Sequence, residues 1–195
     1  MPQGRTVRSS ATDFSGALRQ HPETASQAVN GIEVDAASKR VAEVTLGYII
    51  RGDMARLLIP LPRQPCRIDG LWQHTCFEAF IGFKDSPVYF EFNFSPSGEW
   101  AAYAFRTYRD GGPIENDELD PKIVVRKESE TLELRAMIRL DRLPAIQPTA
   151  TLRVALSAVI EDINGRLSYW ALNHPAGKPD FHHPDSFALD ITLPG

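Results

Sequence analysis

Two glutamates, Glu78 and Glu91, are the residues of this chain whose types and spacing most favour chemistry. If the chain reverses about Lys84 and Asp85, Glu78 lies opposite Glu91 on adjacent antiparallel strands. Two carboxylates in this position repel each other, so the pair requires a cation, a shared proton or a ligand that donates hydroxyl groups. Such a pair could bind a polyhydroxylated ligand or act as an acid and a base.

A purely structural explanation of this pair stays open. A register that differs by one residue would place the two side chains on opposite faces of the sheet. Alternatively, an arginine such as Arg135 or Arg153 could neutralise both carboxylates.

Other side chains are expected on the same face as the two glutamates. Tyr103 falls beside Glu91 if residues 95–98 form the next turn. Trp72 shares the parity of Glu78, and an indole face can stack on a sugar ring while its N–H donates to a hydroxyl. The predicted ligand-binding residues of this meander are Trp72, His74, Glu78, Glu91, Asn93 and Tyr103.

A second segment, residues 169–187, contains three of the five histidines together with three prolines. Its prolines predict an ordered loop over residues 173–185, in which His174 and His182 are further candidate ligand-binding residues. A metal site would combine His174, His182 or His183, and Asp180 or Asp185, with His74 as a possible addition. Because this spacing matches no established set of metal ligands, we favour structural hydrogen bonding and assign no metal ligand.

The elements that position these residues are strands. Apolar and polar residues alternate in residues 88–95, so Phe90, Phe92 and Phe94 should face a core while Glu91 and Asn93 face the other side. The predicted strands are residues 31–37, 41–50, 56–59, three within 71–103, then 122–127, 131–140, 152–161, 166–172 and 187–193. Residues 110–121 should form a loop, and Asn164-Gly165 indicates a type I′ hairpin.

About ten short strands without an amphipathic helix predict an all-β fold, an antiparallel, jelly-roll-like β-sandwich. We expect residues 1–15 to be a flexible N-terminal extension and residues 16–195 to form a single domain. Trp100 shares the parity of the core residues, whereas Trp170 could lie in the core or at a site. Cys66 and Cys76 are expected to be reduced thiols.

Composition narrows the function. The formal net charge is −4, so the chain lacks the basic surface that nucleic acid or anionic lipid would require. It also lacks a long apolar run, and we expect a soluble, cytoplasmic protein with neither nucleic acid nor membrane as partner. Phosphate-loop, dinucleotide-binding, nucleophile-elbow and common zinc motifs are absent, which favours a binding protein over an enzyme, and we assign no catalytic residue.

At the residues quoted above the chain resembles a known family. The run from Trp72 to Phe80, the segment from Tyr89 to Gly98 and the closing residues 169–189 are similar to bacterial DOMON-like domains and the related family 9 carbohydrate-binding modules. The resemblance extends from about Leu18 to the end of the chain and implies a β-sandwich that binds sugars or haem. Fold transfers more securely than function across such a resemblance.

The resemblance implies two sets of ligands. In sugar-binding members, aromatic residues enclose the sugar while carboxylates and amides contact its hydroxyls, and Trp72, Glu78, Glu91 and Asn93 could serve in this way. In haem-binding members a methionine and a histidine are typical axial ligands. Here the corresponding pair would be Met137 with His174 or His182.

We therefore predict a domain that binds a small polar molecule, most favourably a carbohydrate or sugar-containing metabolite, with no cofactor. The first alternative is a haem- or metal-binding protein that uses Met137 and the loop from His174 to His183. The second is an enzyme with Glu78 and Glu91 as its acid and base.

Overall fold

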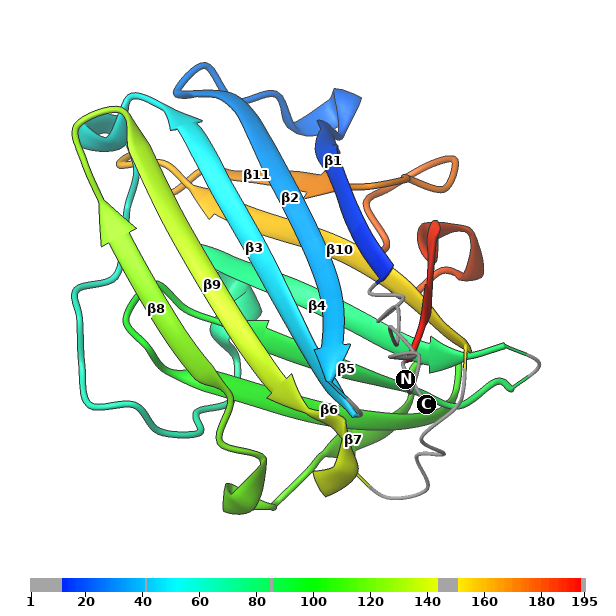
Figure 1. The fold of residues 1–195 in the computed structure, drawn as a ribbon. Coiled ribbons are helices and arrows are strands. Elements are labelled where there is room, and N and C mark those ends of the chain that lie inside the picture. Colours follow the sequence, from blue (N-terminus) through cyan, green and yellow to red (C-terminus); the bar gives the residue numbers. More distant parts are fainter. Residues whose placement is uncertain (1–11, 41, 85, 144–150, 194–195) are drawn as a thin grey trace, which may run out of the picture.

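A computed structural model describes residues 12–40, 42–84, 86–143 and 151–193 of the chain. It confirms the predicted all-β antiparallel sandwich, in which two layers of strands pack face to face (Figure 1). The described residues form twelve strands, compared with the ten or so expected. No helical turn in this part of the chain is long and apolar enough to cross a membrane.

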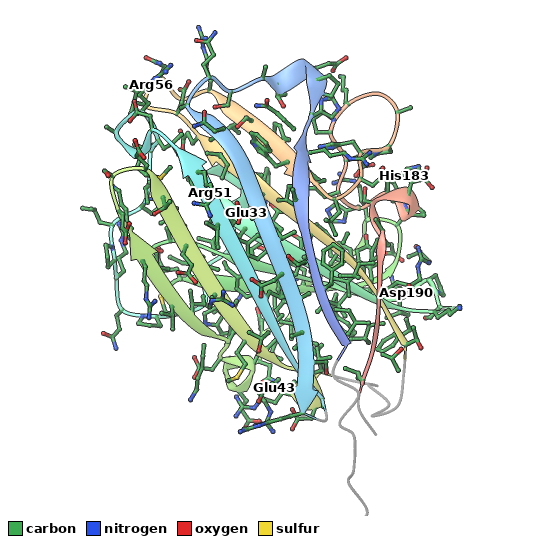
Figure 2. All side chains as sticks on the ribbon, turned by 45° about the horizontal axis from the view of Figure 1, so that its top comes forward. Glu33, Glu43, Arg51, Arg56, His183 and Asp190 are labelled. Atoms are coloured by element: carbon green, nitrogen blue, oxygen red, sulfur yellow. The ribbon has the colours of Figure 1, made fainter. Side chains whose placement is uncertain are left out.

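The front layer in Figure 1 carries the N-terminal strand. In spatial order it contains β1 (Thr12–Gln20), β2 (Val29–Arg40), β3 (Glu43–Gly52), β9 (Thr131–Arg139) and β8 (Lys122–Lys127). Its exposed outer surface is charged, and Figure 2 shows Glu33 beside Arg51, whose guanidinium donates to the carboxylate over 2.7 Å. Such exposed pairs add little stability.

The back layer contains the predicted meander. In spatial order it contains β7 (Asp110–Pro113), β6 (Trp100–Thr107), β5 (Tyr89–Phe94), β4 (Cys76–Phe83) and β10 (Thr151–Glu161). The far edge of β10 pairs with β11 (Leu167–Ala171) along one half and with β12 (Leu189–Thr192) along the other.

Short 3-10 turns connect several of these strands. They are η1 (Pro22–Thr24), η2 (Met54–Arg56), η3 (Leu71–Gln73), η4 (Asp117–Leu119), η5 (Leu140–Arg142) and η6 (Pro184–Ser186). The turn η3 directly precedes β4 and lies against the back layer. Its first residue is anchored there because the N–H of the preceding Gly70 donates a hydrogen bond to the Tyr103 hydroxyl on β6.

The core between the layers confirms the alternation of the meander. Phe90, Phe92 and Phe94 are at most 2% exposed and belong to the cluster of buried side chains that fills this space. Trp100 lies in the same core as predicted, and Trp170, whose position the sequence left open, lies there too.

The other face of the meander is largely covered. Glu91 is 5% exposed and Asn93 is fully buried. A second apolar cluster, the outer cluster, covers this face and consists of Phe80, Tyr89, Phe105, Ala155, Val159, Ala171 and Phe181. Phe181 comes from residues 172–188, the segment between β11 and β12, so this loop acts as a cover over the back layer.

Three predicted segments differ in the structure. Residues 56–59 were expected to be a strand, but the 3-10 turn η2 ends at Arg56 and only Leu57 forms an isolated bridge, with Asp162. The expected loop over residues 110–121 contains β7 and η4. Strand β1 begins at Thr12, so residues 12–15 are not a flexible extension; residues 1–11 lie outside the described part.

The hairpin between β10 and β11 is present, but its turn differs from the type I′ prediction. Gly165 has φ 76°, whereas Asn164 does not have the positive φ that a type I′ turn needs at its first central position. Asp162 fixes the turn, because its carboxylate accepts hydrogen bonds from the Asn164 and Arg166 N–H groups. Both cysteines are free thiols, as expected, with Cys66 exposed and Cys76 buried.

Candidate functional site

A pocket of about 370 Å³ opens on the outer face of the back layer. The meander strands form its floor, and the turn η3 and the loop 172–188 contribute to its walls. Its polar lining residues are Glu78, Glu91, Arg109 and His182. Its aromatic lining residues are Trp72, Phe80, Tyr103, Phe105, Tyr169 and Phe181.

The two predicted glutamates share this pocket but are not directly opposite each other. Glu78 pairs with Asn93, and Glu91 pairs with Phe80, so the true register differs by two residues from the predicted one. A shift of two residues leaves both side chains on the same face, as diagonal neighbours. The prediction that Tyr103 lies beside Glu91 is confirmed.

Burial dominates the electrostatics of the pair. Desolvation, reinforced by the charge of Glu91, raises the pKa of Glu78 well above its ordinary value. Desolvation also raises the pKa of Glu91 to about 7, although a hydrogen bond from Asn93 and the charge of Arg109 act in the opposite direction. Near neutral pH we therefore expect the coupled pair to retain a proton.

The two carboxyl groups differ in their partners. The Asn93 amide donates to Glu91 Oε1 over 2.9 Å. Among the described residues, no donor lies within hydrogen-bond distance of the Glu78 carboxyl group, although Glu78 is only 3% exposed. Its backbone is fixed, because the Tyr48 hydroxyl reaches through the core from β3 and donates to the Glu78 carbonyl. Within the part of the chain that the structure describes, the carboxyl group of Glu78 thus has no hydrogen-bond partner, although its backbone position is anchored.

His182 borders the pair in its neutral form. Burial, followed by the charge of Arg109, lowers the pKa of His182 to about 4. The Tyr89 hydroxyl accepts from the Arg109 backbone N–H and forms a hydrogen bond with His182 Nδ1, 2.9 Å away. His182 Nε2 lies 3.6 Å from Glu91 Oε2, and because the imidazole is neutral this contact is not an ion pair.

Arg109 lines the pocket, and its guanidinium is paired with Asp180. It lies in the turn between β6 and β7 with φ 56°, in the left-handed region. Its guanidinium donates to Asp180 Oδ1 over 2.8 Å, and the Tyr108 hydroxyl donates to Asp180 Oδ2 over 2.6 Å. Since the His182 N–H also donates to Asp180, this carboxylate ties the turn to the loop.

The structure places the predicted ligand-binding residues in two groups. Trp72, Glu78, Glu91, Tyr103 and His182 line the pocket. Trp72 belongs to η3 and not to the predicted strand, yet its side chain is 51% exposed and lies at the pocket.

His74, Asn93 and His174 do not line it. His74 contacts Glu161 Oε2 over 2.7 Å, and His174 Nε2 donates to the Arg19 carbonyl oxygen. Asn93 lies behind Glu91 and positions it, so its role is structural support of the carboxyl group.

One alternative from the sequence, neutralisation by Arg135 or Arg153, is wrong. Neither arginine contacts the glutamates: the first pairs with Asp35 and Glu133, and the second lies over the Phe187 ring. The structure also does not bring together Met137 and His174 or His182, the residue pairs named for haem. Met137 lies on the outer face of β9 in the front layer, whereas the histidines lie beyond the outer face of the back layer, across the whole core.

Metal ligation by the histidine loop has no geometric support. Within the described residues, no three side chains of the ligating types His, Cys, Asp or Glu gather closely enough to hold a metal ion. In Figure 2 His183 lies on the loop that precedes β12, where its Nδ1 accepts the Asp185 N–H and begins the turn η6.

The loop from Asn173 to Asp185 packs on the sheet. The Asn173 amide donates to the Asp185 carbonyl over 2.8 Å and closes the loop, and His21 Nε2 donates to the Gly177 carbonyl. We therefore expect chymotrypsin to cleave slowly after Phe181, which is buried in the folded protein, and rapidly after unfolding in urea, as measured by mass spectrometry of timed digests. Rapid cleavage after Phe181 without urea would contradict an ordered loop.

Sequence reasoning missed Phe80, Phe105, Arg109, Tyr169 and Phe181 as lining residues. Phe80 shares the parity of Glu78, and Phe105 shares that of Tyr103, so alternation could have placed both on this face. No local pattern in the sequence indicates Arg109 or Phe181 as lining residues. The turn between β6 and β7 places Arg109 at the pocket, and the loop 172–188, which is distant in the sequence, places Phe181 there.

Comparisons with known proteins support the fold. No protein-family model matches the chain, and no curated protein sequence matches it. A solved structure of a candidate carbohydrate-binding protein from Bacteroides uniformis superposes with TM-score 0.66 and 14% identity, covering 93% of this chain and 85% of that one.

Two further structures are of a family 9 carbohydrate-binding module from Caldicellulosiruptor kristjanssonii. The complex with glucose has TM-score 0.53 and 12% identity, covering 88% of this chain and 79% of the module. The complex with cellotriose has the same TM-score and identity, covering 93% and 83%. At these identities the likeness establishes one thing, that this chain has the β-sandwich fold of such modules.

Proposed function

We propose that this protein binds a small carbohydrate in the outer pocket. The observation that carries the proposal is the exposed indole of Trp72 at the same pocket as the buried carboxyl groups of Glu78 and Glu91. A sugar ring offers apolar C–H faces to an aromatic ring and hydroxyl donors to carboxylates. The site combines both kinds of partner in a volume suited to a small ligand.

The acceptors are already positioned for a ligand. Glu91 is oriented by Asn93, and no described residue donates to the Glu78 carboxyl group, so hydroxyl donors of a ligand would satisfy a carboxyl group that is buried and lacks a hydrogen-bond partner in this part of the chain. A buried carboxyl group without a hydrogen-bond partner is energetically unfavourable, so the site favours ligands that carry hydrogen-bond donors. The similarity to modules crystallised with glucose and cellotriose supports this proposal, as does the resemblance to DOMON-like domains. A cytoplasmic location stays a prediction.

Isothermal titration calorimetry with mono- and disaccharides tests the proposal. We expect a dissociation constant in the micromolar range or weaker, and Trp72→Ala should weaken binding about tenfold or more through loss of stacking. Val124→Ala is the matched control, because Val124 is exposed on β8 in the other layer. Absence of heat with every sugar tested, or equal affinity in Trp72→Ala, would contradict carbohydrate binding in this pocket.

A second candidate is an enzyme that uses the two glutamates as acid and base. The raised pKa values of Glu78 and Glu91 favour it, since a carboxyl group that stays protonated near neutral pH can act as a general acid. The two functions differ in whether a disaccharide is recovered intact after the titration.

A further inference from the structure

We infer that the outer pocket selects ligands carrying a protonated amine, and that, given the carbohydrate binding proposed above on which this inference rests, the ligand is an amino sugar. The geometry behind this inference is a pair of buried carboxyl groups in a pocket lined with aromatic rings, and in the described ranges of the chain no Lys or Arg side chain contacts either carboxyl group.

The first argument is the balance of charge around the pair. Glu78 is on β4 and Glu91 is on β5, and the nearest cation is Arg109 in the turn between β6 and β7. That guanidinium is paired with Asp180 and only partly offsets the two carboxyl groups, whose pKa values stay raised. His182, the other lining residue that could carry positive charge, is kept neutral by burial, followed by the charge of Arg109. The pair therefore keeps a proton until a ligand supplies a cation.

The remaining titratable groups do not change this balance. Burial, followed by the charges of Glu78 and Glu91, raises the pKa of Cys76 on β4, so Cys76 remains a neutral thiol. The phenols that face the pair, Tyr89 and Tyr103, have pKa values raised by burial and also stay neutral. Tyr169 on β11 completes the lining as a phenol.

The second argument is the number of donors. An ammonium group has three N–H donors, whereas a sugar hydroxyl has one. None of the residues that the structure describes donates to the Glu78 carboxyl group, and Glu91 has the Asn93 amide on one oxygen, so an ammonium group between them could donate to both carboxylates. Its positive charge would also displace the proton that the pair retains.

The third argument is the aromatic wall. The exposed indole of Trp72 and the rings of Tyr103 and Tyr169 line the same space as the carboxyl groups. Aromatic faces attract organic cations, and this attraction grows when the cation leaves bulk water. A neutral sugar gains stacking from these rings, but an amino sugar gains stacking and charge attraction together.

Calorimetry at pH 7 with glucosamine, glucose and N-acetylglucosamine, and with the corresponding galactose series, tests the inference. The N-acetyl sugar is the matched ligand, because its ring is retained while the amine is an uncharged amide. We expect an amino sugar to bind about tenfold or more tightly than its neutral counterparts, with protons released on binding. Proton release is measured by repeating the titration in buffers of different ionisation enthalpy.

The variant Glu78→Gln tests the contribution of charge to this preference. It should weaken binding of the amino sugar more than binding of the neutral sugar, so the ratio of the two affinities falls, and circular dichroism checks that the variant is folded. Equal affinity for the amine and the neutral sugar in the native protein would overturn the inference and leave the proposed function intact. If methylammonium bound while no sugar did, amine selection would stand and the carbohydrate proposal would fail. If none of these ligands bound, both proposals would fall.

Discussion

Replacing Glu91 with glutamine should stabilise the protein more at pH 8 than at pH 5, by about 2.5 kcal/mol in the free energy of unfolding. The folded protein keeps a proton on Glu91 up to about pH 7, whereas the unfolded chain releases it near the ordinary value of 4.5. Between these pH values the folded state binds more protons than the unfolded state, so stability falls as the pH rises. Glutamine carries no charge and removes this penalty.

His182 acts in the opposite direction. Its pKa is lowered to about 4 in the folded state, so its contribution to stability is lost as the pH falls from its ordinary value of 6.5. Because both proteins contain His182, the difference between Glu91→Gln and the native protein isolates the effect of Glu91. Relief of the repulsion on Glu78 adds to the stabilisation in the same direction.

Urea denaturation of both proteins at pH 5 and pH 8 measures this difference. The matched control is Glu33→Gln, since Glu33 is exposed and its pKa is lowered, first by its hydrogen bond to Arg51. This control should lose stability relative to the native protein at pH 8, the reverse sign. An equal stability change for Glu91→Gln at both pH values would show that the carboxyl group titrates normally.

The variant Phe92→Ala should lower the free energy of unfolding by about 3–5 kcal/mol. Phe92 is fully buried between the two layers, where its ring stacks on Phe94 at 6.3 Å between centroids. Removing the ring leaves a cavity that the strands on both sides can only partly fill.

Thermal or urea denaturation of Phe92→Ala provides the measurement, with Val124→Ala as the control for a small change on an exposed strand. The control should change the free energy of unfolding by no more than about 0.5 kcal/mol. A loss of less than about 1 kcal/mol for Phe92→Ala would contradict its position in the core.

Much of the fold could be predicted because the alternation of apolar and polar residues can be recognised within a single strand, without knowledge of its neighbours. The facing of Phe90, Phe92 and Phe94 follows from the period of two, and the charged outer face of β9 follows in the same way. Strand β1 was missed because its sequence, TDFSGALRQ, has few large apolar residues, and its pairing with β2 supplies the stability that its composition lacks.

The site was less predictable because it depends on the pairing register of β4 with β5 and on the loop 172–188, which packs over the outer face of the back layer. The connection between β4 and β5 is longer than the tight turn assumed, which moved the partner of Glu78 from Glu91 to Asn93. Alternation also predicted an open polar face, whereas the loop 172–188 buries it. That burial, which no local pattern reveals, is what raises the pKa of both glutamates.

Nuclear magnetic resonance of the three indole N–H groups tests the proposed sugar site most directly. During titration with glucosamine or glucose, the Trp72 signal should shift, assigned by its loss in Trp72→Phe, because this indole lies at the pocket. The Trp170 signal should stay in place, because its indole is in the core and donates to Ser168. A saturable Trp72 shift is the predicted result. An unchanged Trp72 signal with both sugars would contradict sugar binding in the outer pocket.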